Sequence, residues 1–315
     1  MDAASTPAAE LDHPPIAVIT VTYSPGEHLA EFVESVRAAT TRPTVVILAD
    51  NGSTDGVPEA TAAASDGSVV FLPTGGNVGY GTAINIAARS LKKQRQAGEI
   101  DPDFFVVANP DVVFSAGSID QLIACARRWP NAADVGPLIV EPDGSYYPSA
   151  RAVPTLQNGI GHALFGHLFP NNRWTTMYRR ESDMSRERPA GWLSGSCLLV
   201  RWEAFDEVGG FDERYFMYME DVDLGDRFAR AGYVNVLCTQ ATITHAQGHA
   251  ASKHADTMLP AHHESAYRFQ ADRHAARWQA PLRWALWVGL RVRASVAVRL
   301  AGSMSTKCPK EDTNE

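Results

Sequence analysis

The sequence predicts an α/β protein built on a single, mostly parallel, twisted sheet flanked by helices. Two observations carry this prediction. First, short apolar runs rich in β-branched residues alternate with segments of helical periodicity up to about residue 111. Second, two of these runs end directly at an Asp-containing turn, and ligands bind beyond the carboxyl ends of strands in such sheets. We therefore expect a ligand site at this edge.

The first half of the chain gives the clearest elements. Residues 16–23 (IAVITVTY) predict a buried strand, and Pro25-Gly26 ends it. Apolar residues then recur at i, i+3, i+4 and i+7 from Leu29 to Val36, which indicates an amphipathic helix. Further strands are predicted over residues 44–49, 69–72 and 104–108, with a helix over residues 82–95.

The second half is less regular. Residues 146–189 mix prolines, aromatics and arginines, which is typical of a long functional or partly disordered loop. Strand character returns over residues 196–200. A helix is predicted over residues 221–231, stopped by Gly232, and a last strand over residues 234–237.

Charge is distributed unevenly along the chain. The net charge is −8, yet residues 264–301 carry seven arginines against two acids. An acidic body argues against nucleic acid as a partner, whereas the basic, tryptophan-bearing tail favours an anionic membrane surface. Its longest uncharged stretch, residues 284–290, is too short to span a bilayer. We expect a helix lying in the interface; a helix packed back on the body with a solvated arginine face is the alternative.

The four cysteines lie far apart in the sequence and form no C-x-x-C pair. This spacing predicts neither a disulfide framework nor a zinc site, and it favours a reducing, cytoplasmic setting.

Two segments could contact a nucleotide. Asp50, at the end of a predicted strand, could accept a hydrogen bond from a base or a ribose, although Asp-Asn-Gly-Ser is also an ordinary turn. Residues 75–81 (GGNVGYG) lead into a helix bearing Asn85, and glycines let a ligand approach the backbone closely. Their spacing matches neither a dinucleotide fingerprint nor a phosphate loop, and a structural turn fits this segment equally well.

Three groups could hold a metal ion or a proton. Asp111, in Asn109-Pro110-Asp111, could bind Mg²⁺ or Mn²⁺, and His245 could add an imidazole ligand. Residues 220–223 (EDVD) crowd three carboxylates, which a cation, a substrate or a helix dipole must offset. Each group also has an ordinary structural interpretation: a turn, a strand-end histidine, and acids in the first turn of a helix.

The order of these motifs is more specific than any one of them. DNGSTD (50–55), GGNVGYG (75–81), NPD (109–111), GWLSGSCLLVRWEAFDEVGGFDERYF (191–216), EDVDL (220–224) and then His245 follow one another. Together they resemble the inverting, GT-A-fold glycosyltransferases of family 2, over residues 16–249. An oxidoreductase lacks its glycine fingerprint here, and a nucleotidyltransferase would need basic residues where Ser24-Pro25-Gly26-Glu27 stands.

The resemblance implies a role for each matching residue. Asp221 would be the catalytic base with Glu220 beside it, and Asp111 and His245 would hold Mg²⁺ or Mn²⁺. Asn109 stands where the family's D-x-D motif has its first Asp. The donor nucleotide would contact Thr22, Tyr23, Asp50, Asn77, Asn85 and Asn109, and the acceptor would contact Trp192, Gly195 and Asp223. One displacement assisted by one base inverts the anomeric centre.

The narrower likeness is to enzymes that move L-rhamnose from dTDP-L-rhamnose to N-acetylglucosaminyl-diphosphoryl-polyprenol, in arabinogalactan linker synthesis. A galactofuranosyl- or other hexosyltransferase using a UDP-sugar, and an inactive carbohydrate-binding module, are the alternatives. The sequence is also compatible with a homo-oligomer.

This interpretation divides the chain into four parts. Residues 1–15 and 302–315 are expected to be disordered tails, residues 16–250 a catalytic domain, and residues 251–301 a helical, membrane-associating segment. We expect the protein to be cytoplasmic and peripheral on the inner face of the cell membrane.

Overall fold

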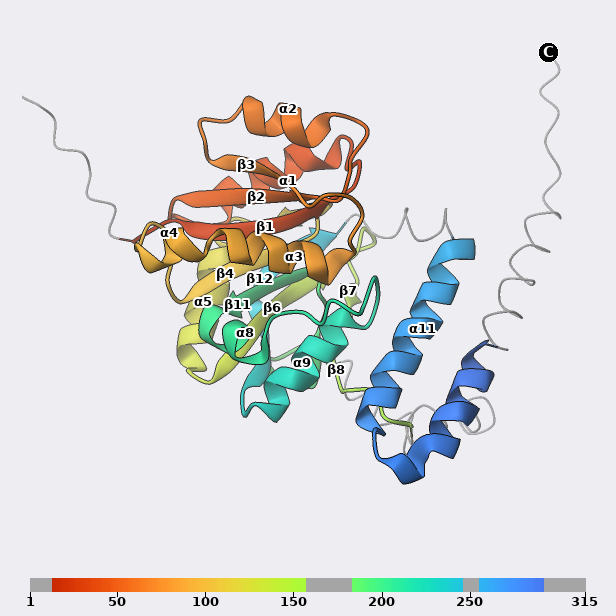
Figure 1. Ribbon diagram of the computed structural model, residues 1–315. Helices are drawn as coiled ribbons and strands as arrows, with labels where there is room; N and C mark the ends of the chain where they lie inside the picture. The colour runs from red at the N-terminus through yellow and green to blue at the C-terminus, as the bar shows by residue number, and fades with distance from the viewer. Residues whose placement is uncertain (1–12, 157–182, 246–254, 292–315) are drawn as a thin grey trace, which may run out of the picture.

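In the computed structural model, the described residues are 13–156, 183–245 and 255–291. They form an α/β fold with one main sheet between two layers of helices, and two further helices beside it (Figure 1). The strand order is β3-β2-β1-β4-β11-β6-β12-β5, with β7 paired to β6 and β9 paired to β12. A separate two-stranded sheet joins β8 (Ala150–Arg151) and β10 (Trp192–Leu193).

The first half of the sheet is parallel, as the sequence predicts. Its strands are β1 (Ile16–Thr22), β2 (Thr44–Asp50), β3 (Val69–Pro73) and β4 (Phe104–Ala108). Both β2 and β4 pair in parallel with β1, and β3 pairs in parallel with β2. Thr22 therefore lies opposite Asp50, at the carboxyl edge where the site was expected.

The second half of the sheet is mixed. Its strands are β5 (Val112–Phe114), β6 (Ala132–Val140), β7 (Tyr146–Tyr147), β9 (Arg188–Ala190), β11 (Cys197–Arg201) and β12 (Val234–His245). β12 runs parallel to β6, but β11 lies antiparallel between β4 and β6. The predicted parallel arrangement thus holds for the first four strands. The reversal of β11 brings the chain before it to the carboxyl edge, where Asn109 N–H donates to Ser196 O (2.9 Å).

Helices cover both faces because β1 buries side chains alternately on each side. One face packs on α1 (His28–Ala38) and α5 (Ser118–Arg128), with α2 (Val57–Ala63) beside β3. The other packs on α3 (Tyr80–Ser90), α8 (Trp202–Val208) and α9 (Glu220–Arg230). The predicted helix over residues 82–95 divides at Leu91 into α3 and α4 (Lys92–Gln96). The sequence patterns assigned no element to residues 112–145, which contain β5, α5 and β6.

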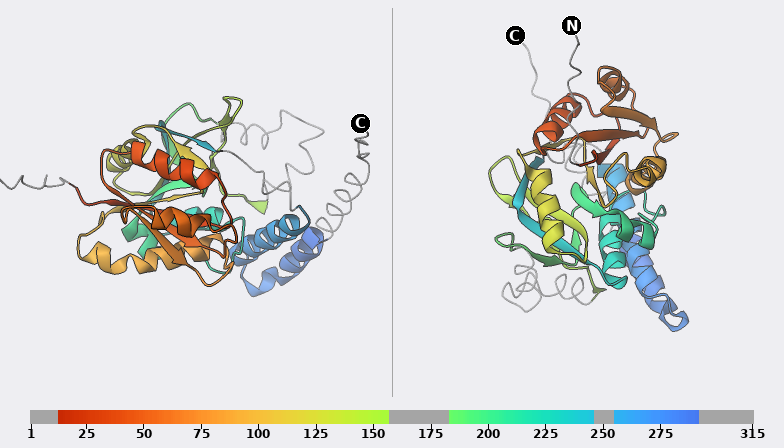
Figure 2. Two further views of the ribbon diagram at one scale, coloured as in Figure 1. Left: turned by 90° about the horizontal axis from the view of Figure 1, so that it is seen from above. Right: turned by 90° about the vertical axis from the view of Figure 1, so that its left-hand side faces the viewer.

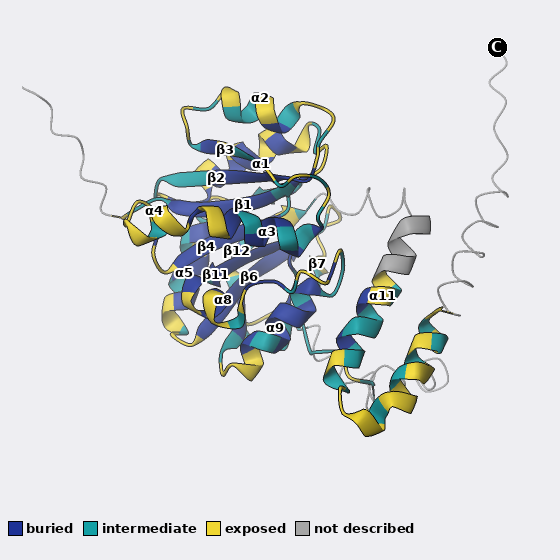
Figure 3. Cartoon of the chain, viewed as in Figure 1, coloured by how far each residue is buried: buried dark blue, intermediate teal, exposed yellow. Residues whose placement is uncertain are grey.

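The C-terminal segment forms two helices that lie side by side (Figure 2). α11 (Ala255–Arg273) packs on α9 and the loop before it: Phe269 is buried with Tyr215 and Val222, and Arg273 forms an ion pair with Asp226. A 3₁₀ turn, η1 (Arg277–Gln279), then leads into a helix over residues 280–291. Most of that second helix is exposed or only half-buried (Figure 3).

None of the described helices is long and apolar enough to cross a membrane. The predicted boundary at residue 250 and the predicted tail over residues 302–315 lie outside the described residues, as does nearly all of the tail over residues 1–15.

Two cysteines that are distant in sequence meet in the fold. Cys125 on α5 and Cys238 on β12 are both buried and both free thiols. Their sulfur atoms and a Glu187 carboxylate oxygen lie within 4.8 Å of one another. The spacing of cysteines along the chain gave no sign of this cluster, because the sheet topology alone brings α5 next to β12.

Candidate active site

The turn after β2 is organised around the Asp50 carboxylate. It accepts hydrogen bonds from Thr22 Oγ1 (2.7 Å), from the backbone N–H groups of Gly52 and Ser53 (both 2.9 Å), and from Ser53 Oγ. These four bonds use most of the acceptor capacity of a carboxylate. Burial raises the pKa of Asp50, but the hydrogen bonds outweigh it and leave the pKa below its ordinary value. Asp50 therefore shapes the edge on which a nucleotide would lie.

The glycine turn before α3 lies next to this edge. Asn51 Nδ2 donates to Gly79 O (3.3 Å) and approaches Asn77 Oδ1 (3.5 Å), and the Asn77 side chain is exposed. Gly79 has a φ of 90°, and a Cβ on it would lie 2.4 Å from Phe216 O. Tyr80 N–H also donates to Phe216 O (3.3 Å). The glycine thus allows this turn to touch the loop that precedes α9.

Asn85, predicted to line the donor pocket, is buried and clamps a different loop. Its Nδ2 donates to Phe211 O (2.8 Å) and Glu213 Oε1 (3.1 Å), and Phe211 N–H donates to its Oδ1 (2.9 Å). These bonds fix the Gly-Gly-Phe-Asp-Glu turn on α3. Tyr23, another predicted donor contact, directly follows β1, and its side chain is 63% exposed.

Asp111 and His245 meet at the edge of the sheet, as predicted for a metal site. His245 Nε2 lies 3.1 Å from Asp111 Oδ1 and 3.4 Å from Asn109 Nδ2. The antiparallel pairing of β12 with β5 fixes this contact, because it sets His245 opposite Val112. Burial raises the pKa of Asp111, but His245, by hydrogen bond and charge, brings the pKa below its usual value. An ionised carboxylate beside an imidazole fits a divalent cation that takes its remaining ligands from a diphosphate and water.

Asp221 lies in the first turn of α9 and faces the chain before β11. Its Oδ2 accepts from Gly195 N–H (3.0 Å) and its Oδ1 from Val222 N–H (2.8 Å). Burial raises the pKa of Asp221 against the hydrogen bonds and the charge of Arg151, which lower it. Burial and the charge of Asp221 also raise the pKa of Glu220, whose Oε2 is buried and has no hydrogen-bond partner in the described part of the chain. A carboxylate with a raised pKa is a stronger proton acceptor once ionised.

The backbone immediately before these acids is strained. Tyr218 and Met219 have φ values of 66° and 68°, in the left-handed region that non-glycine residues seldom adopt. The segment is held from outside, because Ser265 Oγ of α11 donates to Met217 O (2.8 Å). The helix therefore starts abruptly, with Glu220 and Asp221 as its first residues.

Tyr80 connects the groups predicted for catalysis. Its hydroxyl donates to Gly195 O (2.6 Å), so one residue, Gly195, contacts both Tyr80 and Asp221. Burial raises the pKa of Tyr80 well above its usual value, and the charges of Glu220, Asp221 and Asp111 raise it further. The predicted base and the predicted metal-binding carboxylate thus both act on a single half-buried ring. No sequence pattern had marked Tyr80.

The predicted acceptor residues have separate environments. Gly195 contacts Asp221, and Trp192 Nε1 donates to Ala152 O (3.0 Å). The Asp223 carboxylate is buried and accepts from Arg227 Nε (2.7 Å). Arg227 in turn donates to the backbone oxygens of Val208 and Gly210, so this ion pair ties α9 to the end of α8.

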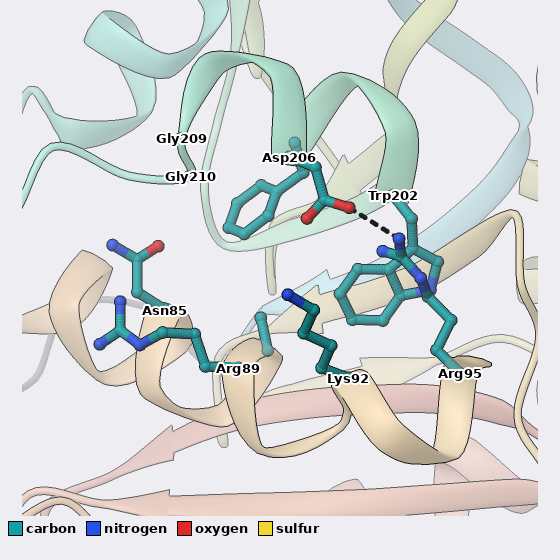
Figure 4. Close-up of a pocket in the computed structure, with 10 residues that line it drawn as sticks. Asn85, Arg89, Lys92, Arg95, Trp202, Asp206, Gly209 and Gly210 are labelled. Carbon is teal, nitrogen blue, oxygen red and sulfur yellow. Dashed lines mark hydrogen bonds and ion pairs between the residues drawn. The ribbon is translucent and has the colours of Figure 1, made fainter. Parts of the chain in front are cut away.

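A cavity of about 430 Å³ lies apart from these groups, between α3, α4 and α8. In Figure 4 the side chains of Arg89, Lys92 and Arg95 line one wall, and Trp202 and Asp206 come from α8. Arg95 forms an ion pair with Asp206 (2.7 Å). Asp111, Asp221 and His245 do not line this cavity, although it reaches the outer side of Asn85.

Comparison with known proteins identifies the family of this chain. Residues 17–209 match the model of the family described as "Glycosyl transferase family 2". The chain is a member of glycosyl transferase family 2. Residues 155–304 of this glycosyltransferase also match "Glycosyl transferase family group 2".

Two curated relatives illustrate the range of likeness. This glycosyltransferase is 53% identical to the N-acetylglucosaminyl-diphospho-decaprenol L-rhamnosyltransferase of Mycobacterium tuberculosis, over 90% of this chain and 93% of that protein. It is 31% identical to the rhamnosyltransferase WbbL of Escherichia coli K12, over 50% of this chain and 57% of that protein.

Solved structures confirm the predicted GT-A fold. A mannosyltransferase from Pyrobaculum calidifontis, in complex with GDP-Man and Mn²⁺, superimposes with a TM-score of 0.55 at 15% identity, over 92% of this chain and 74% of that one. GalNAc-T7, with UDP, GalNAc and Mn²⁺, gives a TM-score of 0.51 at 15% identity, over 74% of this chain and 44% of that one.

Proposed function

We propose that this glycosyltransferase moves L-rhamnose from dTDP-L-rhamnose to polyprenyl-diphosphate-linked N-acetylglucosamine, in the synthesis of a cell-wall arabinogalactan linker. One observation carries the proposal: the 53% identity to the mycobacterial rhamnosyltransferase extends over nearly the full length of both chains. Such a likeness includes the acceptor half as well as the nucleotide half.

Asp221 would take the proton of the acceptor hydroxyl as that oxygen attacks the anomeric carbon. The N–H groups of Gly195 and Val222 hold its carboxylate in place, and its raised pKa suits a general base. A single displacement with one base inverts the configuration of the transferred sugar, and no second carboxylate needs to act as a nucleophile.

Asp111 and His245 would hold the divalent cation, Mg²⁺ or Mn²⁺, with Asn109 beside them. When bound, such an ion offsets the negative charge that accumulates on a departing diphosphate. The 3.1 Å contact between the carboxylate and the imidazole supports this role, because two side chains this close together could share one ion. Thr22 and Asp50 shape the neighbouring edge for the nucleotide.

The C-terminal helices would attach the enzyme peripherally to the inner face of the membrane, where a polyprenyl-linked acceptor resides. Large apolar side chains are exposed here, with Trp278 79% and Trp284 68% accessible. Arg291 lies over the Trp287 ring, with its guanidinium carbon 4.3 Å from the ring centroid. Tryptophans and arginines on an exposed helix are typical of a segment lying in the headgroup region.

The donor and acceptor can be tested with the purified full-length chain. Radiolabelled dTDP-L-rhamnose and a panel of UDP-hexoses would each be offered with an N-acetylglucosaminyl-diphosphoryl-polyprenol, with Mn²⁺, with Mg²⁺ and with chelator. We expect lipid product from dTDP-L-rhamnose alone, abolished by the chelator, with an inverted linkage by NMR. Product from a UDP-hexose would replace the rhamnosyl assignment, and binding without transfer or donor hydrolysis would identify a carbohydrate-binding module.

Membrane attachment can be tested by sedimentation with vesicles. The chain ending at residue 280, and a Trp278→Ala/Trp284→Ala double variant, should bind anionic vesicles less tightly than the full chain does. Tyr146→Ala is a matched control, since Tyr146 is 56% exposed on a different part of the surface. Unchanged vesicle binding by both altered proteins would disprove attachment through these helices.

A further inference from the structure

Arg151 is a cation next to the predicted base, and none of the roles proposed above uses it. It ends β8 (Ala150–Arg151), which pairs antiparallel with β10 (Trp192–Leu193) so that Arg151 lies opposite Trp192. Trp192 packs on α9 so closely that a Cβ on Gly225 would lie 2.8 Å from the Trp192 Cβ. Gly225 is four residues, about one helical turn, after Asp221. The pairing therefore brings the Arg151 side chain to the Asp221 end of α9.

The Arg151 side chain is fixed before any ligand arrives. Its Nε donates to Pro148 O (2.7 Å), and its guanidinium carbon lies 5.3 Å from the Tyr147 ring centroid and 5.7 Å from that of Trp192. Neither Nη atom has a hydrogen-bond partner within residues 13–156, 183–245 and 255–291. A held guanidinium whose two N–H₂ groups bond to no described residue is suited to binding two oxygens of a phosphate or carboxylate.

The positive charge of Arg151 is close enough to act on the base, because it is among the causes that lower the pKa of Asp221 against burial. For Asp111, the largest influence is burial, and the hydrogen bond and charge of His245 oppose it. Arg151 thus acts on the predicted base, and His245 on the predicted metal ligand.

The chain beyond Arg151 leads to the exposed C-terminal helices. Val153 packs against the cluster that contains Phe269 of α11, and Gln270 Nε2 donates to Pro154 O (3.1 Å). In Figure 1, β8 lies between α9 and the lower end of α11. Three features therefore follow one another along the molecule: the Asp221 carboxylate, the Arg151 guanidinium, and the helices that expose Trp278 and Trp284.

We propose that Arg151 binds the diphosphate of the lipid-linked acceptor. This inference rests on the proposed function, in which the acceptor is a sugar joined through a diphosphate to a polyprenyl chain. Its reacting hydroxyl, diphosphate and lipid have the same order as the three features of the protein. Arg151 would thus be a binding residue that selects diphosphate-linked sugars and orients the hydroxyl towards Asp221.

A donor diphosphate is the other source of the same chemistry, and the test must separate the two. We would compare Arg151→Gln with the unaltered enzyme on an N-acetylglucosaminyl-diphosphoryl lipid and on an uncharged alkyl N-acetylglucosaminide. Loss of a charge-assisted hydrogen bond should lower kcat/KM for the diphosphoryl lipid about 10- to 100-fold. The kcat/KM for the uncharged acceptor and the KM for the donor should change by less than about two-fold. Arg151→Lys keeps the charge but not the two parallel N–H donors of the guanidinium. Its kcat/KM for the diphosphoryl lipid should lie between those of the unaltered enzyme and Arg151→Gln.

Arg201→Gln is the matched control. Arg201 also donates from Nε to a backbone oxygen (Ala132 O, 2.8 Å) and lies over an aromatic ring (Phe104, 4.7 Å), but at the opposite end of β11 from Gly195. Arg201→Gln should leave kcat/KM for both acceptors unchanged. Because each variant is judged by the ratio of its two acceptors, a partly unfolded preparation cancels from the comparison.

Other outcomes overturn the proposal. An equal loss on both acceptors would make Arg151 a structural link between β8 and β10, and a rise in donor KM alone would assign it to the donor diphosphate. Direct binding of an isoprenyl diphosphate without sugar gives a second readout that needs no turnover, and Arg151→Gln should weaken it by a similar factor. If the unaltered enzyme transferred no sugar to the diphosphoryl lipid, the proposed function would fail, whereas unchanged isoprenyl diphosphate binding by Arg151→Gln would contradict the role of Arg151.

Discussion

The two halves of the site differ in how fully the hydrogen bonds of their polar groups are satisfied. Around β1, β2 and the glycine turn, carboxylate and amide groups are hydrogen-bonded to the backbone near them: Asp50 accepts four bonds, and Asn51 bonds across to the glycine turn. At the start of α9, Glu220 is buried beside the half-buried Asp221, and Tyr218 and Met219 hold strained backbone conformations. Glu220 Oε2 has no hydrogen-bond partner among the residues that the structure describes.

In the function proposed above, this difference separates nucleotide binding from proton transfer. Groups that are already satisfied keep their geometry and present a fixed surface to a nucleotide at little further cost. Buried acids with raised pKa values cost stability but provide a reactive proton acceptor. Substitutions in the two halves of the site should therefore affect stability and activity differently, and the largest effect is expected at Asp221.

Asp221→Asn should lower turnover by about 10²–10⁴-fold, the usual contribution of a general base. The amide keeps one acceptor oxygen but cannot take the proton. Steady-state transfer assays would measure kcat, and isothermal titration of the donor should give an affinity within about three-fold of the unaltered enzyme.

Asp206→Asn is the control for this substitution, because it also removes a helical carboxylate and leaves the site intact. Near-normal turnover by Asp221→Asn would disprove the assignment of the base.

Asp111→Asn should lower the affinity for the divalent cation by at least about 10-fold, since one of the two proposed protein ligands loses its charge. The measurement is activity as a function of Mn²⁺ concentration, with saturating metal restoring part of the rate. Asp120→Asn serves as a control, because Asp120 accepts hydrogen bonds from Thr40 and Thr41 away from this edge. An unchanged metal dependence would remove Asp111 from the metal site.

Asp50→Asn and Glu220→Gln should change stability in opposite directions. At neutral pH the first should lower the free energy of unfolding by about 1–3 kcal/mol, because an amide can accept at only one of the two oxygen positions. With its oxygen towards the N–H groups of Gly52 and Ser53, its NH₂ group would face the hydroxyls of Thr22 and Ser53, which now donate to the carboxylate. The second should raise it, since each unit by which burial raises a pKa costs about 1.4 kcal/mol when the group ionises.

The direction of each pKa shift determines how the corresponding stability difference changes with pH. Asp50 has a lowered pKa, so its contribution is present above the unfolded value of 3.8 and is lost as pH falls through the folded one. Glu220 has a raised pKa, so it reduces stability as pH rises from the unfolded value of 4.5 to the folded one. Denaturant unfolding should show the Glu220→Gln difference shrinking as pH falls towards 4.5, whereas the Asp50→Asn difference should persist there and shrink only below pH 3.8. A Glu220→Gln variant less stable than the unaltered enzyme at pH 8 would contradict this assignment.

Asn77→Ala and Asn85→Ala should separate a ligand contact from a structural clamp. Asn77 is exposed, so its loss should change the free energy of unfolding by less than about 0.5 kcal/mol while raising the donor KM. Asn85 makes three buried hydrogen bonds, so its loss should cost about 1–3 kcal/mol. Thermal unfolding and donor titration measure the two effects, and a stability loss at Asn77 would reverse the roles.

Much of the fold could be predicted from local pattern. β4 begins and ends where its apolar run does, and α1 buries the four residues that recur at helical spacing. The direction of β11 could not be predicted, because periodicity gives the length of a strand but not its partner. For the same reason, the contact between Cys125 and Cys238 could not be predicted, because it depends on which elements pack together.

Less of the site could be predicted. Residue order predicts Asp111, His245 and Asp221 as site residues, because their motifs are ordered, and the fold brings Asp111 and His245 into contact. Tyr80 and Arg151 contact residues more than 40 positions away, Gly195 and Trp192, and no local pattern marks such a contact. Asn85 and Asp223 match the family's motifs, yet a motif does not reveal that a side chain is committed to a neighbouring turn or to Arg227.

The contact at Gly79 has a consequence for the order of events. Its backbone lies against the carbonyl of Phe216, two residues before the left-handed pair that leads into Asp221. A nucleotide sugar that moves the glycine turn would therefore also move the peptide of Phe216. That peptide belongs to the segment that positions Asp221, the proposed proton acceptor. Sequential binding with the donor first is the kinetic scheme that such a linkage favours.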